Sequence, residues 1–447
     1  MTISERDRRY RWVIVVGLLV FMSINFAQKA VIGLAAIPII HEFHLTPTRF
    51  GAIVSSFFIL FSISAIVVGA FADRVRTRVL VLSMAIIWAL CQLPALIVAT
   101  PAMLMLSRIV LGASQGGAYS VSVHAIYKWF PDRERSLPTS VLSLGGPLGA
   151  GVYAPLMATV IADFGWRTAF LSLAIVGFAW AAVWFFIGKE EPDNAGAAQG
   201  HAGTGSPDNA SMPDHVPLTA LLLSRTFLGS TLCGIGSYVA LILPISWLPS
   251  FLTRVGGYSM VQVGKVLLVA AVFQMVCMPL LGWWSQHLLR RGIGSRHARG
   301  TLASMALLIS GITFASLSVM PAGAGLIAAV VLALAANSIV FPVTFTLNGE
   351  IAPARQRATL LGIHNSIITI GALVTPVIMG KMIELAANPL DGYRTGMAGA
   401  GACVIVSAIG AALVINPAAD RRRFISRFSN DATQPPCASV PPVASET

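Results

Sequence analysis

The chain has 447 residues, of which 56% are hydrophobic and only 11% are charged. Soluble domains carry about 25% charged residues, so these few charges cannot cover a soluble protein of this size. Together with a mean hydropathy of +0.77, the composition excludes a soluble enzyme and predicts an integral membrane protein. Apolar runs such as VIVVGLLVF do not alternate with polar residues, which favours helical spans over β-strands.

In chain order, the apolar segments form two sets of six separated by a gap. Each segment is close to the roughly 20 residues that cross a bilayer. The first one is long and has no small-residue cleavage site, so we interpret it as a retained span. The segments fall at 12–40, 49–72, 79–99, 102–128, 138–163 and 167–187, and then at 226–252, 261–289, 300–320, 322–347, 357–386 and 396–416.

These segments predict an all-α integral membrane fold with twelve transmembrane helices in two six-helix pseudo-repeats. Residues 1–187 would form the first bundle and residues 226–416 the second. The Gly-, Ala-, Asp- and Pro-rich stretch within 188–225 is typical of a cytoplasmic linker. We expect the tail, residues 417–447, to be disordered and cytoplasmic.

The placement of Lys and Arg predicts the orientation of the chain. Most of the 30 Lys and Arg residues fall in the termini and in the loops on the same side. The positive-inside rule therefore places both termini in the cytoplasm of a bacterial-type inner (plasma) membrane. This placement also explains the net charge of +12, so we expect no nucleic-acid partner.

Cofactor and enzyme chemistry find little support in the sequence. The five cysteines have neither disulfide nor metal-ligand spacing, and no nucleophile–base pair occurs at membrane depth. We therefore expect no metal, no cofactor and no catalytic residue.

Two loops at matching positions resemble each other. GAFADRVRTR (69–78) follows the second span and GWWSQHLLRRG (282–292) follows the eighth. An internal parallel repeat of this kind is typical of transporters built from two bundles around a midplane site.

The first of these loops and two further motifs resemble the major facilitator superfamily. They are the Gly–Asp–Arg loop, an Arg-x3-Gly pair in the fourth span and a Gly/Pro-rich fifth span. The matching residues are Gly69, Asp73, Arg74, Arg76 and Arg78; Arg108 and Gly112; and Gly145, Gly146, Pro147, Gly149 and Gly151. The resemblance implies a secondary transporter that works by alternating access.

Within that superfamily the chain is similar to the anion:cation symporter family, which imports organic acids. The motifs are Asn25-Phe26 with Lys29, Trp129-Phe130-Pro131, Glu134-Arg135, Gly165-Trp166-Arg167, Trp247-Leu248-Pro249, Glu350-Ile351-Ala352-Pro353 with Arg357, and Gly362 with Asn365. The resemblance implies small organic anions (carboxylates) as substrates.

Two cations are expected inside the membrane. Lys29 shares one face of the first span with Asn25 and Gln28, because they are three to four residues apart. Arg108 and Gln115 share a face of the fourth span for the same reason. A charge at this depth is costly and marks a functional site, so these five residues are candidates for binding the substrate anion. Snorkelling of Lys29 and a structural Arg108 are the alternatives.

The family commonly has carboxylates where this chain has Gln28 and Gln115, and an amide has no titratable proton. None of the 18 acidic residues is predicted in a span interior. Coupling to protons would then need another group, for which His364 is the candidate. Exchange of anions, passive transport or coupling to another cation are the alternatives.

The remaining candidates lie elsewhere. Asn365 and Tyr238 are expected to line the substrate cavity, although each is also a normal packing residue. The loop residues are expected to form a cytoplasmic latch between the halves: Gly69, Asp73, Arg74, Arg76, Arg78, Arg133 and Arg135. A topology signal alone is the alternative.

The sequence therefore predicts a carrier of small organic anions that functions as a monomer in the lipid bilayer, with H+ or another cation as a possible co-substrate. An anion exchanger or uniporter is the alternative within transporters. A transport-incompetent membrane sensor on the same scaffold is the alternative outside them.

Overall fold

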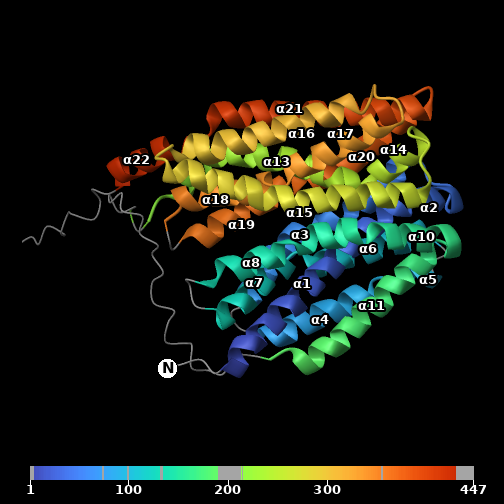
Figure 1. Ribbon diagram of the computed structural model, residues 1–447, viewed down its shortest axis with the longest axis horizontal. Helices are drawn as coiled ribbons and strands as arrows, with labels where there is room; N and C mark the ends of the chain where they lie inside the picture. Colours follow the sequence, from blue (N-terminus) through green and yellow to red (C-terminus); the bar gives the residue numbers. More distant parts are fainter. Residues whose placement is uncertain are drawn as a thin grey trace, which may run out of the picture.

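The computed structural model describes residues 5–72, 75–97, 100–130, 134–189, 213, 215–353 and 356–428, and these residues contain helices and no strand. The helices lie nearly side by side along the length of the molecule (Figure 1). The start of α1 and α22 lie towards one end, here called the α22 end. The short helices α2 and α14 lie at the opposite end, here called the α2/α14 end (Figure 1).

The described part of the first half contains eleven α-helices and one π-helical turn. Elements α8, α9, η2 and α10 together form the fifth span. In chain order its elements are α1 (Glu5–Leu34), α2 (Ala36–Glu42), α3 (Pro47–Ala72), α4 (Thr77–Leu90), α5 (Pro94–Ile97), α6 (Pro101–Gln115), α7 (Ala118–Trp129), α8 (Ser136–Ser143), α9 (Gly145–Pro147), η2 (Leu148–Val152), α10 (Ala154–Phe164) and α11 (Trp166–Ile187).

The second half repeats this pattern of long helices joined by short connections. Its elements are α12 (Leu218–Leu222), α13 (Arg225–Ser246), α14 (Leu248–Arg254), α15 (Met260–Arg290), η4 (Arg296–Thr301), α16 (Leu302–Ser316), α17 (Ala324–Asn337), α18 (Val340–Ile351), α19 (Arg357–Ile368), α20 (Ile370–Leu385), α21 (Pro389–Val414) and α22 (Pro417–Phe428).

The twelve-helix membrane fold expected from the sequence is confirmed. Within the described residues, eleven segments are long and apolar enough to cross a membrane. The remaining span is formed by α6 and α7, which meet at Gly116 and Gly117. Polar residues such as Arg108 and Gln115 interrupt the apolar character of this span, because it contributes buried polar groups to the interior.

Three close approaches between the two halves lie near the α2/α14 end. A Cβ atom built at Gly51 of α3 would lie 2.2 Å from the carbonyl oxygen of Pro376 in α20. A Cβ at Gly380 would lie 2.4 Å from the carbonyl oxygen of Pro47, and one at Gly33 would lie 2.2 Å from that of Ile245. Glycine lets two helix backbones come this close, so the halves are tightly joined at this end.

A polar cluster also ties α2 to α11 at this end. The carboxylate of Glu42 accepts hydrogen bonds from Trp166 Nε1 at 2.8 Å and from Arg167 Nη1 at 2.7 Å. The hydrogen bond from Arg167 holds the pKa of the Glu42 carboxyl below its usual value. The Gly-Trp-Arg motif noted in the sequence therefore has a structural role here.

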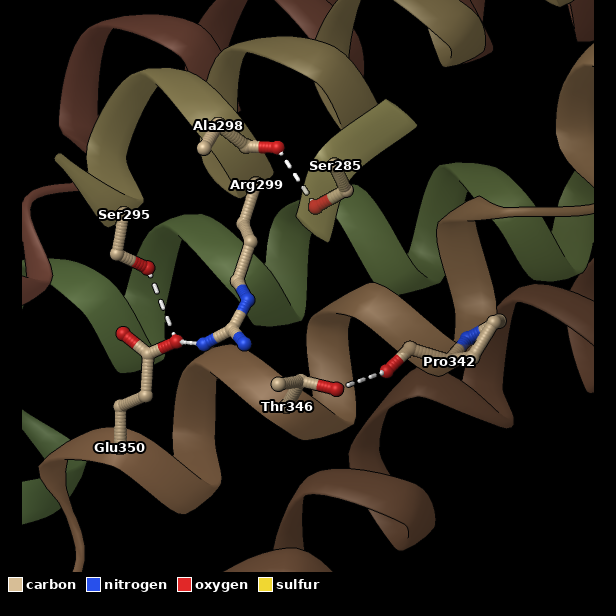
Figure 2. Close-up of polar contacts among 7 residues, drawn as sticks. All are labelled: Ser285, Ser295, Ala298, Arg299, Pro342, Thr346 and Glu350. Atoms are coloured by element: carbon tan, nitrogen blue, oxygen red, sulfur yellow. Dashed lines mark hydrogen bonds and ion pairs between the residues drawn. The ribbon is translucent and has the colours of Figure 1, made fainter. Parts of the chain in front are cut away.

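At the α22 end, a second polar cluster connects η4 with α18 (Figure 2). Glu350 forms an ion pair with Arg299 and accepts a hydrogen bond of 2.9 Å from Ser295 Oγ. Ser285 of α15 donates to the carbonyl oxygen of Ala298 at 2.8 Å. These contacts join the ends of three segments of the second half.

The prediction that the tail is disordered from residue 417 is wrong for its first part, because Pro417–Phe428 forms helix α22. The Asp420 carboxylate, only 3% exposed, accepts hydrogen bonds from the backbone N–H and the hydroxyl of Thr226, at 2.7 and 2.6 Å. Phe424 is 2% exposed and packs with Phe227 and Leu221. The run Arg421–Arg423 indicated a solvated segment, so the sequence did not predict the buried side of α22. The rest of the tail lies outside the described residues, as does most of the predicted linker.

Candidate functional site

Lys29 of α1 lines a cavity at the junction of the two halves. The cavity is narrow in this conformation, with an accessible volume of about 10 Å³, which is about the room that one water molecule needs. Helix α3 contributes Val54, Phe57 and Phe58, and helix α13 of the second half contributes Ile242 and Ile245; Ile32 and Arg108 complete the wall. Two cations therefore face one cavity, and none of its described lining residues is acidic.

The ammonium group of Lys29 lies against aromatic rings. Its Nζ atom is 4.5 Å from the ring centre of Phe26, 5.0 Å from that of Phe61 and 5.5 Å from that of Phe57. The electron-rich faces of such rings attract a cation. The side chain is half-buried, and these three rings are here called the aromatic cage.

Arg108 is only 2% exposed and is held by the first half. Its Nη1 donates to the backbone carbonyl of Gln28 at 3.3 Å, and its Nη2 donates to Gln92 Oε1 at 3.0 Å. Its guanidinium also lies 5.1 Å from the ring centre of Phe170. Its Nε has no hydrogen-bond partner among the described residues. Arg108 thus combines a structural role with one remaining donor.

Gln28 and Gln115 meet inside the first half. Gln115 Nε2 donates to Gln28 Oε1 at 3.1 Å, and a Cβ built at Gly177 of α11 would lie 3.8 Å from Gln28 Nε2. Neither amide lines the Lys29 cavity. Gln28 therefore turns towards α6 and α11, whereas Lys29 turns towards α3 and the cavity. A rotation of about 100° per residue separates neighbouring helix positions.

Asn25 is 1% exposed, and neither of its side-chain amide atoms has a hydrogen-bond partner among the described residues. A buried polar group without a partner is unfavourable unless a water or a ligand satisfies it. Asn25 is thus available to a polar group of a bound molecule, although it does not line the cavity around Lys29.

The candidates of the second half form two separate contacts. The hydroxyl of Tyr238 in α13 donates to Asn365 Oδ1 in α19 at 3.5 Å. His364 is fully buried between the rings of Phe227 and Phe345, and its Nδ1 lies 3.1 Å from the Thr231 hydroxyl. Its Nε2 has no hydrogen-bond partner among the described residues.

The predicted latch is described only in part, because Asp73, Arg74 and Arg133 lie outside the described residues. Arg135 donates to the carbonyl oxygens of Phe130 and Tyr127 at 3.0 and 3.1 Å. Arg78 donates to the carbonyl oxygen of Phe185 at 2.5 Å. These contacts lie within the first half. Gly69 belongs to α3, and Arg76 is the exposed residue before α4.

Sequence analysis missed Gln92 and the aromatic cage. Gln92 is 0% exposed and supports Arg108. A lone amide within the apolar run 79–99 was the available signal. The cage gave no signal, because phenylalanines in apolar spans are ordinary packing residues and only the tertiary structure brings Phe57 and Phe61 of α3 to Lys29 of α1.

Comparison with known proteins gives one family. Residues 13–324 match the model of the Major Facilitator Superfamily. The hexuronate transporter of Bacillus subtilis (strain 168) is 24% identical over 68% of this chain and 70% of its own. The probable sulfoacetate transporter of Cupriavidus necator is 24% identical over 90% of this chain and 93% of its own. The D-galactonate transporter of Escherichia coli O6:H1 is 24% identical over 85% and 91%.

Solved structures show the same fold. A bacterial homologue of the human lysosomal transporter Spinster, inward-facing and unoccupied, superposes with a TM-score of 0.73 and 18% identity, covering 93% of this chain and 98% of that one. The inward-open xylose transporter of E. coli has a TM-score of 0.68 and 15% identity, covering 89% and 95%.

Proposed function

Because this chain belongs to the Major Facilitator Superfamily, and is therefore a membrane transporter and not an enzyme, we propose that it carries small organic anions across a bacterial inner membrane. The observation that carries the proposal is the cavity between the halves, where Lys29 and Arg108 are the charged groups and no described lining residue is acidic. Such a cavity attracts an anion and repels a cation.

The two cations have different roles in this proposal. Lys29 binds the substrate carboxylate, because its ammonium lies against the aromatic cage and its side chain also lines the cavity. Arg108 adds positive potential and offers its Nε, while Gln92 and the Gln28 carbonyl hold its two terminal nitrogens. Named relatives carry hexuronate, sulfoacetate and D-galactonate, all anions, which supports an anionic substrate here.

The amides complete the proposed binding region. Gln28 and Gln115 hold one another and keep one unpartnered atom each, Gln28 Nε2 and Gln115 Oε1, among the described residues. Asn25 has two such atoms. From the second half, Tyr238 and Asn365 close the region by contacting one another. Rocking of the halves would bring Asn365 and Lys29 to the same substrate from opposite sides.

Coupling to protons is assigned to His364 in this proposal. The positions that commonly carry acids in similar carriers hold Gln28 and Gln115, whose amides have no titratable proton. Another residue must therefore bind and release the coupled proton. His364 has one ring nitrogen on the Thr231 hydroxyl and one without a partner among the described residues. Anion exchange, uniport and coupling to another cation are the competing modes.

Uptake of a labelled carboxylate into proteoliposomes tests the proposal. With an imposed pH gradient, proton coupling predicts accumulation against the anion gradient, and His364→Asn should abolish the accumulation but retain counterflow. Accumulation that survives His364→Asn would contradict both the histidine route and uncoupled transport. Accumulation that is absent in the unsubstituted protein would favour exchange or uniport.

The same assay tests transport itself against the sensor alternative. Lys29→Ala and Arg108→Ala should each reduce counterflow strongly, because each removes a cation from the cavity. Carboxylate binding without any counterflow in the unsubstituted protein would instead support a sensor.

A latch at the cytoplasmic side is the remaining part of the proposal. In this arrangement the α22 end faces the cytoplasm, in keeping with the Lys and Arg distribution of the sequence. Arg76, Arg78 and Arg135 are the described arginines of this proposed latch, whereas Asp73, Arg74 and Arg133 lie outside the described residues.

A further inference from the structure

Helix α22 has a buried face and an exposed face. Pro417, Asp420 and Phe424 are buried against the second half. The exposed residues recur every three to four positions and therefore form one stripe along the helix. This stripe, here called the basic face, consists of Ala418, Ala419, Arg422, Arg423, Ser426 and Arg427. Half of its residues are arginines, and none is acidic.

The buried face fixes α22 in place. The Asp420 carboxylate accepts two hydrogen bonds from Thr226, and Phe424 packs with residues of α12, α13, α18 and α19. The link from α21 is also packed, because a Cβ built at Gly229 would lie 2.7 Å from Ile415 Cγ1. The only acid of α22 is thus used in an internal contact. Among the described residues, the three arginines of the basic face form no ion pair.

The residues around α22 indicate its depth in the membrane. Leu413, in the last turn of α21, is 73% exposed. Leu223 and Leu228, on either side of the start of α13, are also exposed, and Arg225 between them is an exposed fourth arginine. Exposed leucines of a span lie against acyl chains, whereas arginines at its end lie at the level of the headgroups. The basic face follows where the lipid-facing leucines end, beyond the end of α21 (Figure 1).

A phosphate group of an anionic lipid matches this face in charge and geometry. A guanidinium can donate two parallel hydrogen bonds to a phosphate. Basic residues directly beyond the end of a span are attracted to anionic headgroups. The basic face has no large apolar side chain, so the helix would lie on the headgroups and not insert among the acyl chains, as helices with exposed Trp, Phe or Leu do.

We propose that the basic face of α22 binds the phosphate groups of anionic phospholipids and so anchors this end of the second half to the membrane surface. The surface is separate from the Lys29 cavity, and its binding does not depend on which substrate is carried. In a cell, the proposal rests on the proposed cytoplasmic position of the α22 end, where anionic headgroups attract basic segments.

Hydrogen–deuterium exchange of the full-length protein in nanodiscs tests the proposal. We expect the amides of α22 to exchange at least about threefold more slowly in phosphatidylglycerol than in phosphatidylcholine, because several arginines gain phosphate partners. The amides of α14, at the opposite end, serve as the internal reference for general effects of the lipid. About 0.5 M NaCl should remove most of the difference, since salt screens exposed charges.

A triple variant with a matched control assigns the effect to the basic face. Arg422→Gln, Arg423→Gln and Arg427→Gln together should abolish the slower exchange in phosphatidylglycerol and leave exchange in phosphatidylcholine unchanged, because these side chains form no internal ion pair among the described residues. The control combines Arg49→Gln, Arg254→Gln and Arg394→Gln, which removes the same charge from exposed positions outside α22. It should retain the effect of phosphatidylglycerol on α22.

Three outcomes would overturn the proposal. The first is equal exchange of α22 in the two lipids, and the second is slower exchange that persists in the triple variant. The third is an equal slowing by inorganic phosphate added to phosphatidylcholine nanodiscs, which would assign the face to free phosphate and not to lipid. Each of these outcomes would leave the proposed anion carrier intact, because Lys29-dependent counterflow is measured separately.

Discussion

Lys29 and Arg108 are both cations that line the cavity, but their surroundings differ. Lys29 is half-buried against the aromatic cage and faces the cavity. Arg108 is 2% exposed and donates through two nitrogens to groups of α1 and of the turn after α4. A change of cation type should therefore be tolerated better at Lys29 than at Arg108, since only a guanidinium presents its donors in a rigid fork.

An exchange of the two cation types tests this difference. We expect Arg108→Lys to lower transport at least about tenfold and to lower thermal stability, because one ammonium cannot reach both the Gln28 carbonyl and Gln92. Lys29→Arg should keep transport within about tenfold, since a guanidinium also binds carboxylates and aromatic faces. Counterflow and thermal unfolding measure the two effects. The control is Arg254→Lys at an exposed position of α14, and equal behaviour of all three would contradict the assignment.

Gln92 matters at the same scale because it satisfies a buried donor of Arg108. Gln92→Leu would leave Arg108 Nη2 without this acceptor in a site that excludes water, at a cost of about 1–3 kcal/mol in the free energy of unfolding. The matched control, Gln286→Leu, changes an exposed amide of α15 and should have little effect. Thermal unfolding in detergent provides the comparison, and a Gln92→Leu protein as stable as the control would refute the role of this amide.

At the scale of elements, α22 is held to the second half through the start of α13. Ser224 caps α13 by accepting from the N–H of Phe227, and Asp420 accepts from the N–H of Thr226, one residue earlier in the same helix. A carboxylate at a helix N-terminus is favoured by the helix dipole as well as by the hydrogen bond. Phe424 adds burial four residues further along the same face of α22.

Removal of this carboxylate should release α22. Asp420→Ala would leave the Thr226 N–H unsatisfied, so we expect the amides of α22 to exchange their hydrogens at least about tenfold faster, in line with the loss of roughly 1–2 kcal/mol for a removed cap. Hydrogen–deuterium exchange followed by mass spectrometry measures this change. Arg423→Ala, on the exposed face of the same helix, is the control. Equal exchange in both variants would show that Asp420 does not hold the helix.

At the scale of the whole molecule, glycines allow the halves to meet at the α2/α14 end. Gly51 faces the carbonyl oxygen of Pro376, and Gly380 faces that of Pro47. Side chains there would separate α3 from α20. In the proposed alternating-access cycle this end must close and open, so the close approach is needed in one state and lost in the other.

A bulky residue at one of these glycines should therefore block the cycle without removing the binding site. We expect Gly51→Val to reduce counterflow at least about tenfold and to retain Lys29-dependent binding, because its Cβ would lie 2.2 Å from the Pro376 carbonyl oxygen. Gly325→Val is the control, since Gly325 also lies near the start of a helix but has open space around it. Wild-type transport by Gly51→Val would contradict the need for this contact.

Much of the fold was predictable because hydropathy is a local property of the chain. The runs of apolar residues predicted the helical spans, although α6 and α7 are less apolar than the rest, since they carry buried polar groups. The tail was predicted less well. Its basic residues Arg421, Arg422 and Arg423 suggested a solvated segment, while the contacts of Asp420 and Phe424 depend on α13, almost two hundred residues away in sequence.

The sequence alone was enough to predict a helical membrane protein with cations and no acids in its span interiors, because the cost of a charge in the bilayer depends mainly on its position along a span. The use of those cations depends on tertiary contacts. Gln28 and Lys29 are neighbours in α1, yet one bonds to Gln115 and the other faces Phe57 and Ile242 across the cavity. Helix rotation and the meeting of the two halves decide such contacts, and neither is a local property of the sequence.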